Sequence, residues 1–531
     1  MGRRAIYVLL ILLVSMALRL YPTIISGLPF STDSWPLIRN AESFIEYSPT
    51  SLESRVFDDY NIYWPLSQIE GAILSIILPA SPLDSMRIYI PFLASLSPLI
   101  LYIFLKRLTG NELLGFLAGL LFAAGGPHAI FTAGVTKETF SGIFFIQMIY
   151  LFSALKPSPR SIACFIILSS ALTMSHHLSY LVLVAILANI LVAEVFLPRI
   201  RRFPLKWKLV MLVCSAAIGS AYYLLYASRG LKILIGFSDW LSAFSFQALV
   251  FMTLYYVITR PKPRRLPNTW IAVILIAFIA LLANQLIPLI PAAPRLSPLA
   301  LFYACLMIFI GIFDVLGLYS AKEHQLDGKI YPIIFWISAV LGLEGYAIFG
   351  ADPSVSLSLA YRLPNFILPA LAALAVIGIP RLVLNGESRF PRILSIFILS
   401  FLVAGLMSQS YSAVFLKENY LGYQWLYLPQ EFQEAIWLKR YVGDQAIYGD
   451  LKVKYLVEGY LGLKVDSGAG YTFLAGKSVP SSGSLLTLYG EMWRNGYLLG
   501  PYGVELPCGW SERLTDRNMV FSNLYAIIYE I

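Results

Sequence analysis

The sequence has few charged residues and few cysteines, and each shortage excludes a class of protein. Charged residues make up 13% of the 531 residues and hydrophobic residues 58%, whereas soluble globular proteins carry about 25% charged residues. No soluble core could bury this much apolar sequence, so the composition excludes a water-soluble protein. The four cysteines have no paired spacing typical of a zinc site or a disulfide framework.

Apolar runs long enough to cross a hydrocarbon layer of about 30 Å as helices recur from Ala5 to Ser410. They predict a polytopic α-helical membrane protein of thirteen transmembrane helices, whereas Leu66–Pro79 is apolar but short and predicts an interfacial helix. After Tyr411 the sequence becomes polar and rich in Gly and Tyr, so we expect a membrane domain over 1–410 and a small α/β domain over 411–531. The predicted spans are 5–22, 86–106, 112–131, 138–155, 160–177, 178–197, 208–227, 241–258, 268–289, 298–318, 330–349, 361–380 and 393–410.

The net charge of +9 indicates topology, not a nucleic-acid partner, because most Lys and Arg residues lie in short clusters between the apolar runs. With the N-terminus inside, clusters such as 199–208 and 260–265 fall on one side, as cytoplasmic loops should. The first apolar run follows Arg3 and Arg4 and lacks a small-residue cleavage site, which predicts a retained helix. We therefore expect a multi-pass plasma-membrane protein with a cytoplasmic N-terminus and an extracytoplasmic 411–531 region.

Under this topology the polar residues best suited to chemistry gather on the outer face. Charged residues at membrane depth are costly and usually line a polar cavity, so their gathering predicts a site that opens outward. The candidates are Asp33, Glu42, Asp58, Asp59, Lys137, Glu138, His176, His177, Arg295 and Arg362.

Each acidic candidate has a structural alternative. Asp33 is either a catalytic base or the cap of a helix that starts near Ser34. The Asp58-Asp59 pair is more typical of a solvated loop than of a metal site. Glu138 lies where a helix begins, where a carboxylate favours the helix dipole.

The basic candidates also have two interpretations. Lys137 either contacts a phosphate or extends its ammonium to the membrane surface. His176 and His177 are adjacent on a helix and point in different directions, so joint ligation of a metal is not expected. Arg295 and Arg362 either reach the lipid headgroups or use the guanidinium fork to bind a phosphate.

The order of these features resembles the GT-C superfamily of membrane glycosyltransferases, which use sugars on polyprenyl phosphate carriers. The resemblance rests on Asp33 after the first helix, the long outer loop with Leu66–Pro79, Arg87 at the start of the second helix, and Thr136-Lys-Glu138. Thirteen helices and an outward tail are similar to the catalytic subunit of oligosaccharyltransferases. The Trp-Trp-Asp-X-Gly signature of that subunit is missing from residues 411–531, and the chain looks more like relatives of protein O-mannosyltransferases.

The resemblance implies an inverting transfer of a sugar from a polyprenyl (dolichyl) phosphate to an acceptor hydroxyl on a glycan, lipid or protein. Asp33 would accept the proton, and Lys137, Arg295 and Arg362, aided by His176 or His177, would neutralise the departing phosphate. No cofactor is certain, and a divalent cation such as Mg²⁺ or Mn²⁺ stays open. Two alternatives also stay open: transfer of an oligosaccharide or glycan from a lipid pyrophosphate, and a polytopic lipid or glycan transporter.

Overall fold

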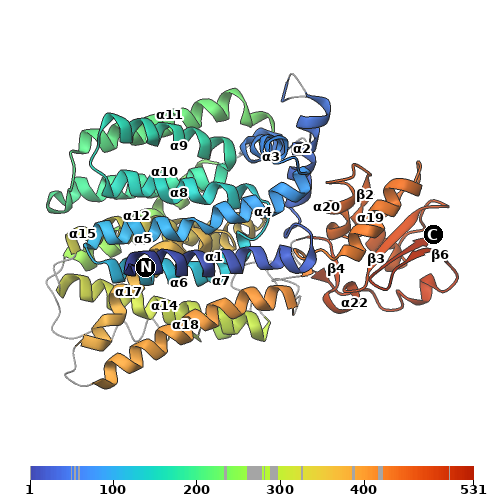
Figure 1. The fold of residues 1–531 in the computed structure, drawn as a ribbon. Coiled ribbons are helices and arrows are strands. Elements are labelled where there is room, and N and C mark those ends of the chain that lie inside the picture. Colours follow the sequence, from blue (N-terminus) through green and yellow to red (C-terminus); the bar gives the residue numbers. More distant parts are fainter. Residues whose placement is uncertain are drawn as a thin grey trace. The chain divides into compact units, whose positions relative to one another are not determined.

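A computed structural model of the chain describes residues 2–48, 51–52, 56–57, 60–231, 236–259, 275, 278–279, 281–286, 297–323, 327–384, 389–415, 423–500 and 503–531. Helices predominate up to Phe415, and strands occur only after it within these ranges (Figure 1). The elements up to that point are α1 (Arg3–Ser26), α2 (Ser34–Tyr47), η1 (Asn61–Tyr63), α3 (Leu66–Ile77), α4 (Pro82–Ser95), α5 (Ser97–Thr109), α6 (Glu112–Ala124), α7 (Gly126–Phe131), α8 (Lys137–Ala154), α9 (Pro159–Ser175), α10 (His177–Phe196), η2 (Pro198–Ile200), α11 (Leu205–Leu225), η3 (Ala227–Arg229), α12 (Phe237–Thr259), α14 (Pro298–Glu323), α15 (Asp327–Phe349), α16 (Pro353–Ala360), α17 (Leu363–Leu384) and α18 (Arg389–Phe415).

The predicted spans coincide with these helices, with two unforeseen breaks. Pro98 stands at the start of α5 and interrupts the predicted 86–106 span after α4, because proline cannot donate a helical hydrogen bond. Gly125 ends α6 and divides the predicted 112–131 span. The prediction for 268–289 lies mostly outside the described residues. Helix α2 begins at Ser34, where the cap interpretation of Asp33 placed the start of a helix, and α16 was not predicted.

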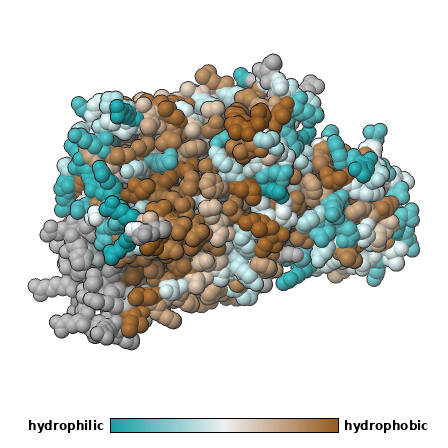
Figure 2. Space-filling model, viewed as in Figure 1, coloured by the Kyte–Doolittle hydropathy of each residue, from teal (hydrophilic) through white to brown (hydrophobic). Residues whose placement is uncertain are grey.

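The length and composition of the helices confirm a polytopic α-helical membrane protein. In the described part of the chain, eight segments are long and apolar enough to cross a membrane, and α3, α6, α9 and most of α18 are shorter apolar helices. Figure 2 shows apolar side chains over a broad area of the helices, with hydrophilic residues toward their ends on the left of the view.

The chain divides into two compact units, and the cuts fall inside α1, α4, α8 and α18. Unit 1 comprises Met1–Ala17, Leu93–Phe131 and Ser141–Gln409, and it contains most of the described helices that are long and apolar enough to cross a membrane. Unit 2 comprises Leu18–Phe92, Thr132–Phe140 and Ser410–Ile531. The C-terminal region therefore forms one unit with the first long loop.

Glycines allow close packing of two helices in unit 1. A Cβ atom at Gly317 in α14 would lie 2.1 Å from the carbonyl oxygen of Leu374 in α17, and one at Gly378 would lie 2.1 Å from that of Phe313. No larger residue could keep these backbones so close, which is the usual role of small residues between membrane helices.

Unit 2 contains the short helices of the first long loop. In α3 the residues Ile73, Ile76 and Ile77 are exposed although they are large and apolar, while Gln68 and Ser75 are buried. An apolar exposed face on a short helix suits the predicted interfacial position.

The C-terminal part of unit 2 is the predicted small α/β fold. A five-stranded sheet has the order β2-β1-β3-β7-β6, in which β1 is parallel to β2 and β3 while β7 is antiparallel to β3 and β6. The elements are α19 (Pro429–Tyr441), β1 (Ile447–Tyr448), α20 (Leu451–Val457), β2 (Val465–Asp466), α21 (Ser467–Leu474), β3 (Leu485–Tyr489), α22 (Met492–Asn495), β4 (Tyr497–Leu498), β5 (Gly503–Val504), η5 (Glu512–Leu514), β6 (Asn518–Ser522) and β7 (Ala526–Glu530).

Trp35 of α2 belongs to the hydrophobic core of this α/β fold. It is fully buried, and its indole contacts the rings of Tyr427, Phe432 and Tyr460 at centroid distances of 5.1, 5.7 and 5.4 Å. The aromatic contacts fix α2, and with it the residue before α2, against the C-terminal fold.

Candidate functional site

The turn that carries Asp33 is fixed to the segment that leads into Lys137. Phe30 forms a parallel bridge with Gly134, and the Val135 amide donates to the Ser34 hydroxyl over 3.0 Å. A Cβ atom at Gly134 would lie 2.3 Å from the Phe30 carbonyl oxygen, so this approach requires glycine. The two segments, about a hundred residues apart in the sequence, are thus side by side.

The backbone before Asp33 is strained, and contacts with the C-terminal fold hold it in place. Ser31 has a φ of 86°, a conformation that costs a non-glycine residue about 1–3 kcal/mol and often occurs at functional sites. Its amide donates to the Trp425 carbonyl oxygen over 2.8 Å, and the Trp425 ring meets the Phe30 ring edge to face at 6.0 Å. The structure around Ser31 therefore overcomes its unfavourable φ.

The Asp33 side chain is exposed between the buried residues Thr32 and Ser34. Asp33 does occupy the N-cap position of α2, but its side chain makes no capping hydrogen bond. The geometry thus gives little support to the cap interpretation and leaves the carboxylate accessible to a substrate.

Aromatic rings surround the ammonium group of Lys137. Its Nζ lies 4.0 Å from the ring centroid of Tyr60 and 4.9 Å from that of Trp64, both in the first long loop. Cation–π attraction of this kind holds the ammonium in one place. Glu138 lies in the first turn of α8, where its charge favours the helix dipole as the structural alternative expects.

Arg19 is a charged residue of this unit that was not among the candidates from the sequence. It is fully buried near the end of α1, and its Nε donates to the Thr132 hydroxyl over 2.8 Å. A single arginine inside the first apolar run is itself a signal, because a buried cation in a membrane helix is costly unless it has a role. Its bond to Thr132 ties α1 to the start of the segment that ends at Lys137.

Two other charged residues of the loop have structural partners. Arg87 pairs with Asp84 over 2.7 Å and also donates to the Gly27 carbonyl oxygen after α1. Glu42 accepts a hydrogen bond from the Tyr460 hydroxyl at 2.9 Å, and burial raises the pKa of Glu42. Glu42 is therefore a contact between α2 and the C-terminal fold, while Asp58 and Asp59 lie outside the described residues.

The histidine pair lies in unit 1. His176 is the N-cap of α10, and its Nδ1 lies 2.7 Å from the Ser179 hydroxyl, which lies 2.9 Å from that of Ser141. The His177 ring meets the His176 ring edge to face at 5.2 Å. A capping role therefore accounts for His176.

Arg362 also lies in unit 1, between α16 and α17. Its Nε donates to the Tyr361 hydroxyl over 2.8 Å, and the Tyr361 ring stacks on Phe131 at 5.8 Å. Arg295 lies outside the described residues. The expected convergence of Lys137, Arg295 and Arg362 on one phosphate stays a prediction.

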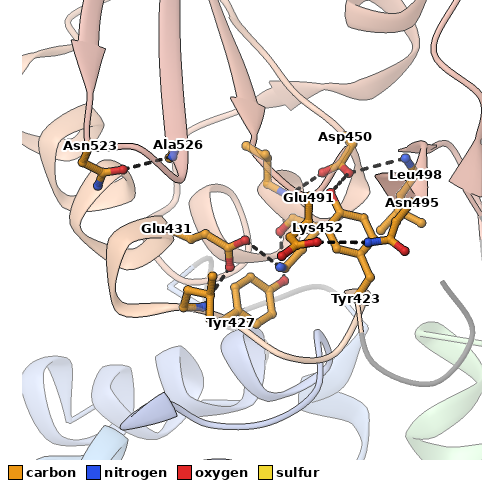
Figure 3. Close-up of polar contacts among 12 residues, drawn as sticks. Tyr423, Tyr427, Glu431, Asp450, Lys452, Glu491, Asn495, Leu498, Asn523 and Ala526 are labelled. Atoms are coloured by element: carbon orange, nitrogen blue, oxygen red, sulfur yellow. Dashed lines mark hydrogen bonds and ion pairs between the residues drawn. The ribbon is translucent and has the colours of Figure 1, made fainter. Parts of the chain in front are cut away.

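A buried polar cluster in the C-terminal fold was not foreseen. Lys452 and Glu431 are each 1% exposed and pair over 2.7 Å (Figure 3). The Lys452 ammonium also lies 4.7 to 5.4 Å from the ring centroids of Tyr423, Tyr427 and Tyr489. Burial of an ion pair costs desolvation free energy, and a pair so little exposed to water is stable only when additional partners offset that cost.

Asp450 caps α20 beside this pair. Its Oδ1 accepts from the Val453 amide over 3.0 Å, and its Oδ2 accepts from the Tyr423 hydroxyl over 3.3 Å (Figure 3). Burial raises the pKa of Asp450 to about 6. The cluster fixes the segment 423–427, which includes the Trp425 carbonyl bonded to Ser31.

No metal site is evident in the described part of the chain. Among those residues, no group of three or more His, Cys, Asp or Glu side chains could hold an ion. A divalent cation therefore has no identified ligands in the ranges given above.

Comparison with known proteins finds solved structures with a similar fold. No protein-family model and no curated protein matches the sequence. The Archaeoglobus fulgidus oligosaccharyltransferase, tethered to an acceptor peptide with the NVT sequon, matches with a TM-score of 0.59, 14% identity and coverage of 92% of this chain and 69% of that chain. The complex of AglB from the same organism with an inhibitory peptide and a dolichol-phosphate matches with a TM-score of 0.60, 13% identity and the same coverage.

A third structure of the Archaeoglobus fulgidus enzyme, in complex with Zn and sulfate, matches with a TM-score of 0.56 and 12% identity, and covers 92% of this chain and 68% of that chain. At such identities the likeness establishes a shared fold and leaves the activity to be argued from the site.

Proposed function

The fold shared with the archaeal oligosaccharyltransferase is the GT-C fold of membrane glycosyltransferases, and on this premise we propose that the chain transfers a sugar from a polyprenyl phosphate carrier to an acceptor hydroxyl. The observation that carries the proposal is the exposed Asp33 carboxylate, in a strained turn that is hydrogen-bonded to the segment leading into Lys137. The dolichol-phosphate in the AglB complex supports a lipid phosphate as the carrier.

In the proposed reaction Asp33 accepts the proton of the acceptor hydroxyl while that oxygen attacks the anomeric carbon. The bond from the anomeric carbon to the phosphate oxygen breaks, and polyprenyl phosphate leaves with the electron pair. Attack opposite the leaving group inverts the anomeric centre. General-base catalysis of this kind accelerates a reaction by about 10²–10⁴.

Positive charge near the leaving phosphate is the second requirement. Lys137 lies in the same compact unit as Asp33, and the rings of Tyr60 and Trp64 hold its ammonium in place. Arg295, Arg362, His176 and His177 remain proposed contributors, and a divalent cation such as Mg²⁺ or Mn²⁺ remains an option. In this proposal the Asp33 carboxylate accepts the proton and the Lys137 ammonium contacts the phosphate, and neither role depends on the other contributors.

The site would lie on the outer face of the plasma membrane. The positive clusters between the apolar runs support a cytoplasmic N-terminus, and thirteen spans would then put residues 411–531 outside the cell. A glycan, lipid or protein exposed at that surface would supply the acceptor hydroxyl.

A second candidate function is transfer of a whole oligosaccharide from a lipid pyrophosphate to a peptide. The match to a solved oligosaccharyltransferase tethered to an acceptor peptide favours it. The missing Trp-Trp-Asp-X-Gly signature in residues 411–531 favours transfer of a single sugar. Mass analysis of the product distinguishes one added sugar from many.

The test compares wild type with Asp33→Asn, which keeps the size of the side chain and removes the basic carboxylate. We expect sugar transfer from a radiolabelled polyprenyl-phosphate donor to fall about 10²–10⁴-fold while donor binding is retained. Glu46→Gln, which alters an exposed carboxylate on the same helix, is the matched control and should transfer normally. Near-normal transfer by Asp33→Asn would disprove the assignment and move the search to Glu42, Asp58 and Asp59.

A further inference from the structure

Two tryptophans lie beside each other on the C-terminal fold. Trp493 lies in α22 and Trp510 shortly before η5, and their ring centroids are 5.9 Å apart with an interplanar angle of 31°. Trp493 is 51% exposed, whereas Trp510 is half-buried because it packs against the hydrophobic core. One ring is therefore anchored to the core, and the other is presented to the surroundings.

The surface beside Trp493 is formed by small and backbone groups. A Cβ atom at Gly490 would lie 3.6 Å from the Trp493 ring and 3.5 Å from the Tyr525 carbonyl oxygen. Leu524, whose carbonyl is also near this point, is 89% exposed and has a φ of 73°. An exposed apolar patch with a strained residue at its border is costly, and such patches usually mark a binding site.

The neighbouring residues carry charges of both signs. Glu491 and Arg494 flank Trp493 in the sequence, and Glu512 and Arg513 follow Trp510. An anionic membrane surface would require an excess of Lys and Arg, and insertion into hydrocarbon would bury these charges at high cost. The balance of charge therefore suits an uncharged ligand that has an apolar face and hydrogen-bonding edges.

We propose that Trp493 and Trp510 form a binding platform for the sugar rings of a neutral oligosaccharide. The C–H face of a pyranose is apolar and stacks on an indole ring, while its hydroxyls can bond to carboxylate, guanidinium and backbone carbonyl groups. The binding itself is independent of the proposed glycosyl transfer. That the bound sugar belongs to the acceptor or the product rests on that proposed function.

The test measures binding of mannotriose and chitotriose to the purified full-length chain in lipid nanodiscs. Trp493→Ala should weaken binding of the preferred sugar by about fivefold or more, since an aromatic contact is lost. Tyr441→Ala removes another exposed aromatic ring of the same fold, on α19, and should leave binding unchanged. No sugar binding by wild type, or equal binding by Trp493→Ala, would overturn the proposal.

A second measurement separates sugar binding from membrane contact. Quenching of Trp493 fluorescence by brominated lipids, obtained as the difference between wild type and Trp493→Phe, would place the ring in the bilayer interface and overturn the proposal. Asp33→Asn should bind the sugar as wild type does. If Asp33→Asn transfers sugar normally while Trp493→Ala loses sugar binding, the catalytic assignment is wrong and the binding platform is supported. If Asp33→Asn loses transfer while Trp493→Ala binds sugar as wild type does, the catalytic assignment is supported and the platform is wrong.

Discussion

At the scale of single residues, the ammonium groups of two lysines in unit 2 lie against aromatic rings. Tyr60 and Trp64 contact the Lys137 ammonium, and three tyrosines surround Lys452. A ring face attracts a cation without neutralising it. For Lys137 these contacts hold the ammonium in place, which suits its proposed contact with a phosphate.

Replacement of Lys137 by Met keeps an apolar side chain against the rings and removes the charge. We expect the KM for the polyprenyl-phosphate donor to rise about tenfold or more, because a charge-assisted contact to the phosphate is lost. Steady-state transfer kinetics measure it. Lys206→Met, which removes an exposed lysine in the first turn of α11, is the control, and an unchanged KM in Lys137→Met would contradict the phosphate role.

The buried carboxyl of Glu434 makes the stability of the C-terminal fold depend on pH. Burial raises the pKa of Glu434 to about 8, although Thr487 donates a hydrogen bond to it over 2.9 Å. The folded state then binds more protons than the unfolded state between about pH 4.5 and 8, so the free energy of unfolding falls as pH rises through this range.

Glu434→Gln should remove this dependence, because glutamine keeps the acceptor oxygen for Thr487 and does not ionise. At pH 8 we expect slower amide hydrogen exchange in β3 for the variant than for wild type, by about tenfold or more, and little difference at pH 5. Both proteins are compared at the same pH, which cancels the intrinsic effect of pH on exchange. Faster exchange in the variant at pH 8 would show that the ionised carboxylate stabilises the fold.

At the scale of helices and strands, the apolar runs were predictable because hydrocarbon thickness fixes their length. Helix α2 was expected only as the alternative in which Asp33 caps a helix near Ser34. Its packing was not foreseen because its polar residues, Asn40 and Glu42 among them, are buried or half-buried by partners far away in the sequence. The cluster of Glu431, Asp450 and Lys452 was missed for the same reason. Asp33 and Lys137 could be selected from their places beside helices, but their fixed neighbours, Trp425 and Tyr60, follow only from the tertiary structure.

The packing of α14 on α17 gives a test at this scale. Gly317→Ala would force a Cβ atom against the Leu374 carbonyl, and we expect destabilisation of about 1–3 kcal/mol. Gly311→Ala is the matched control on the same helix, since a Cβ atom there meets nothing within 4 Å, and alanine favours a helix. Thermal unfolding in detergent measures both, and an equal Tm for the two variants would show that the helices separate at little cost.

At the scale of the whole chain, cysteine labelling tests the predicted topology. Cys508 is exposed in the C-terminal fold and serves as a native probe once Cys164, Cys214 and Cys305 are replaced by serine. We expect a membrane-impermeant maleimide to label Cys508 on intact cells, because residues 411–531 are predicted to be external. Lys206→Cys in a cysteine-free background should be labelled only after lysis, and the opposite pattern would move Asp33 to the cytoplasmic side.

The contacts between the first long loop and the C-terminal fold also have a consequence for folding during synthesis. Glu42 and its partner Tyr460 are 418 residues apart, and the aromatic core around Trp35 consists of residues beyond 422. Because a chain is synthesised from its N-terminus, Asp33 would leave the ribosome long before the groups that fix its turn exist. A chain terminated before residue 423 would contain the predicted membrane helices but lack the groups that hold the Asp33 turn, so the proposed site would form only after the C-terminal fold has been synthesised.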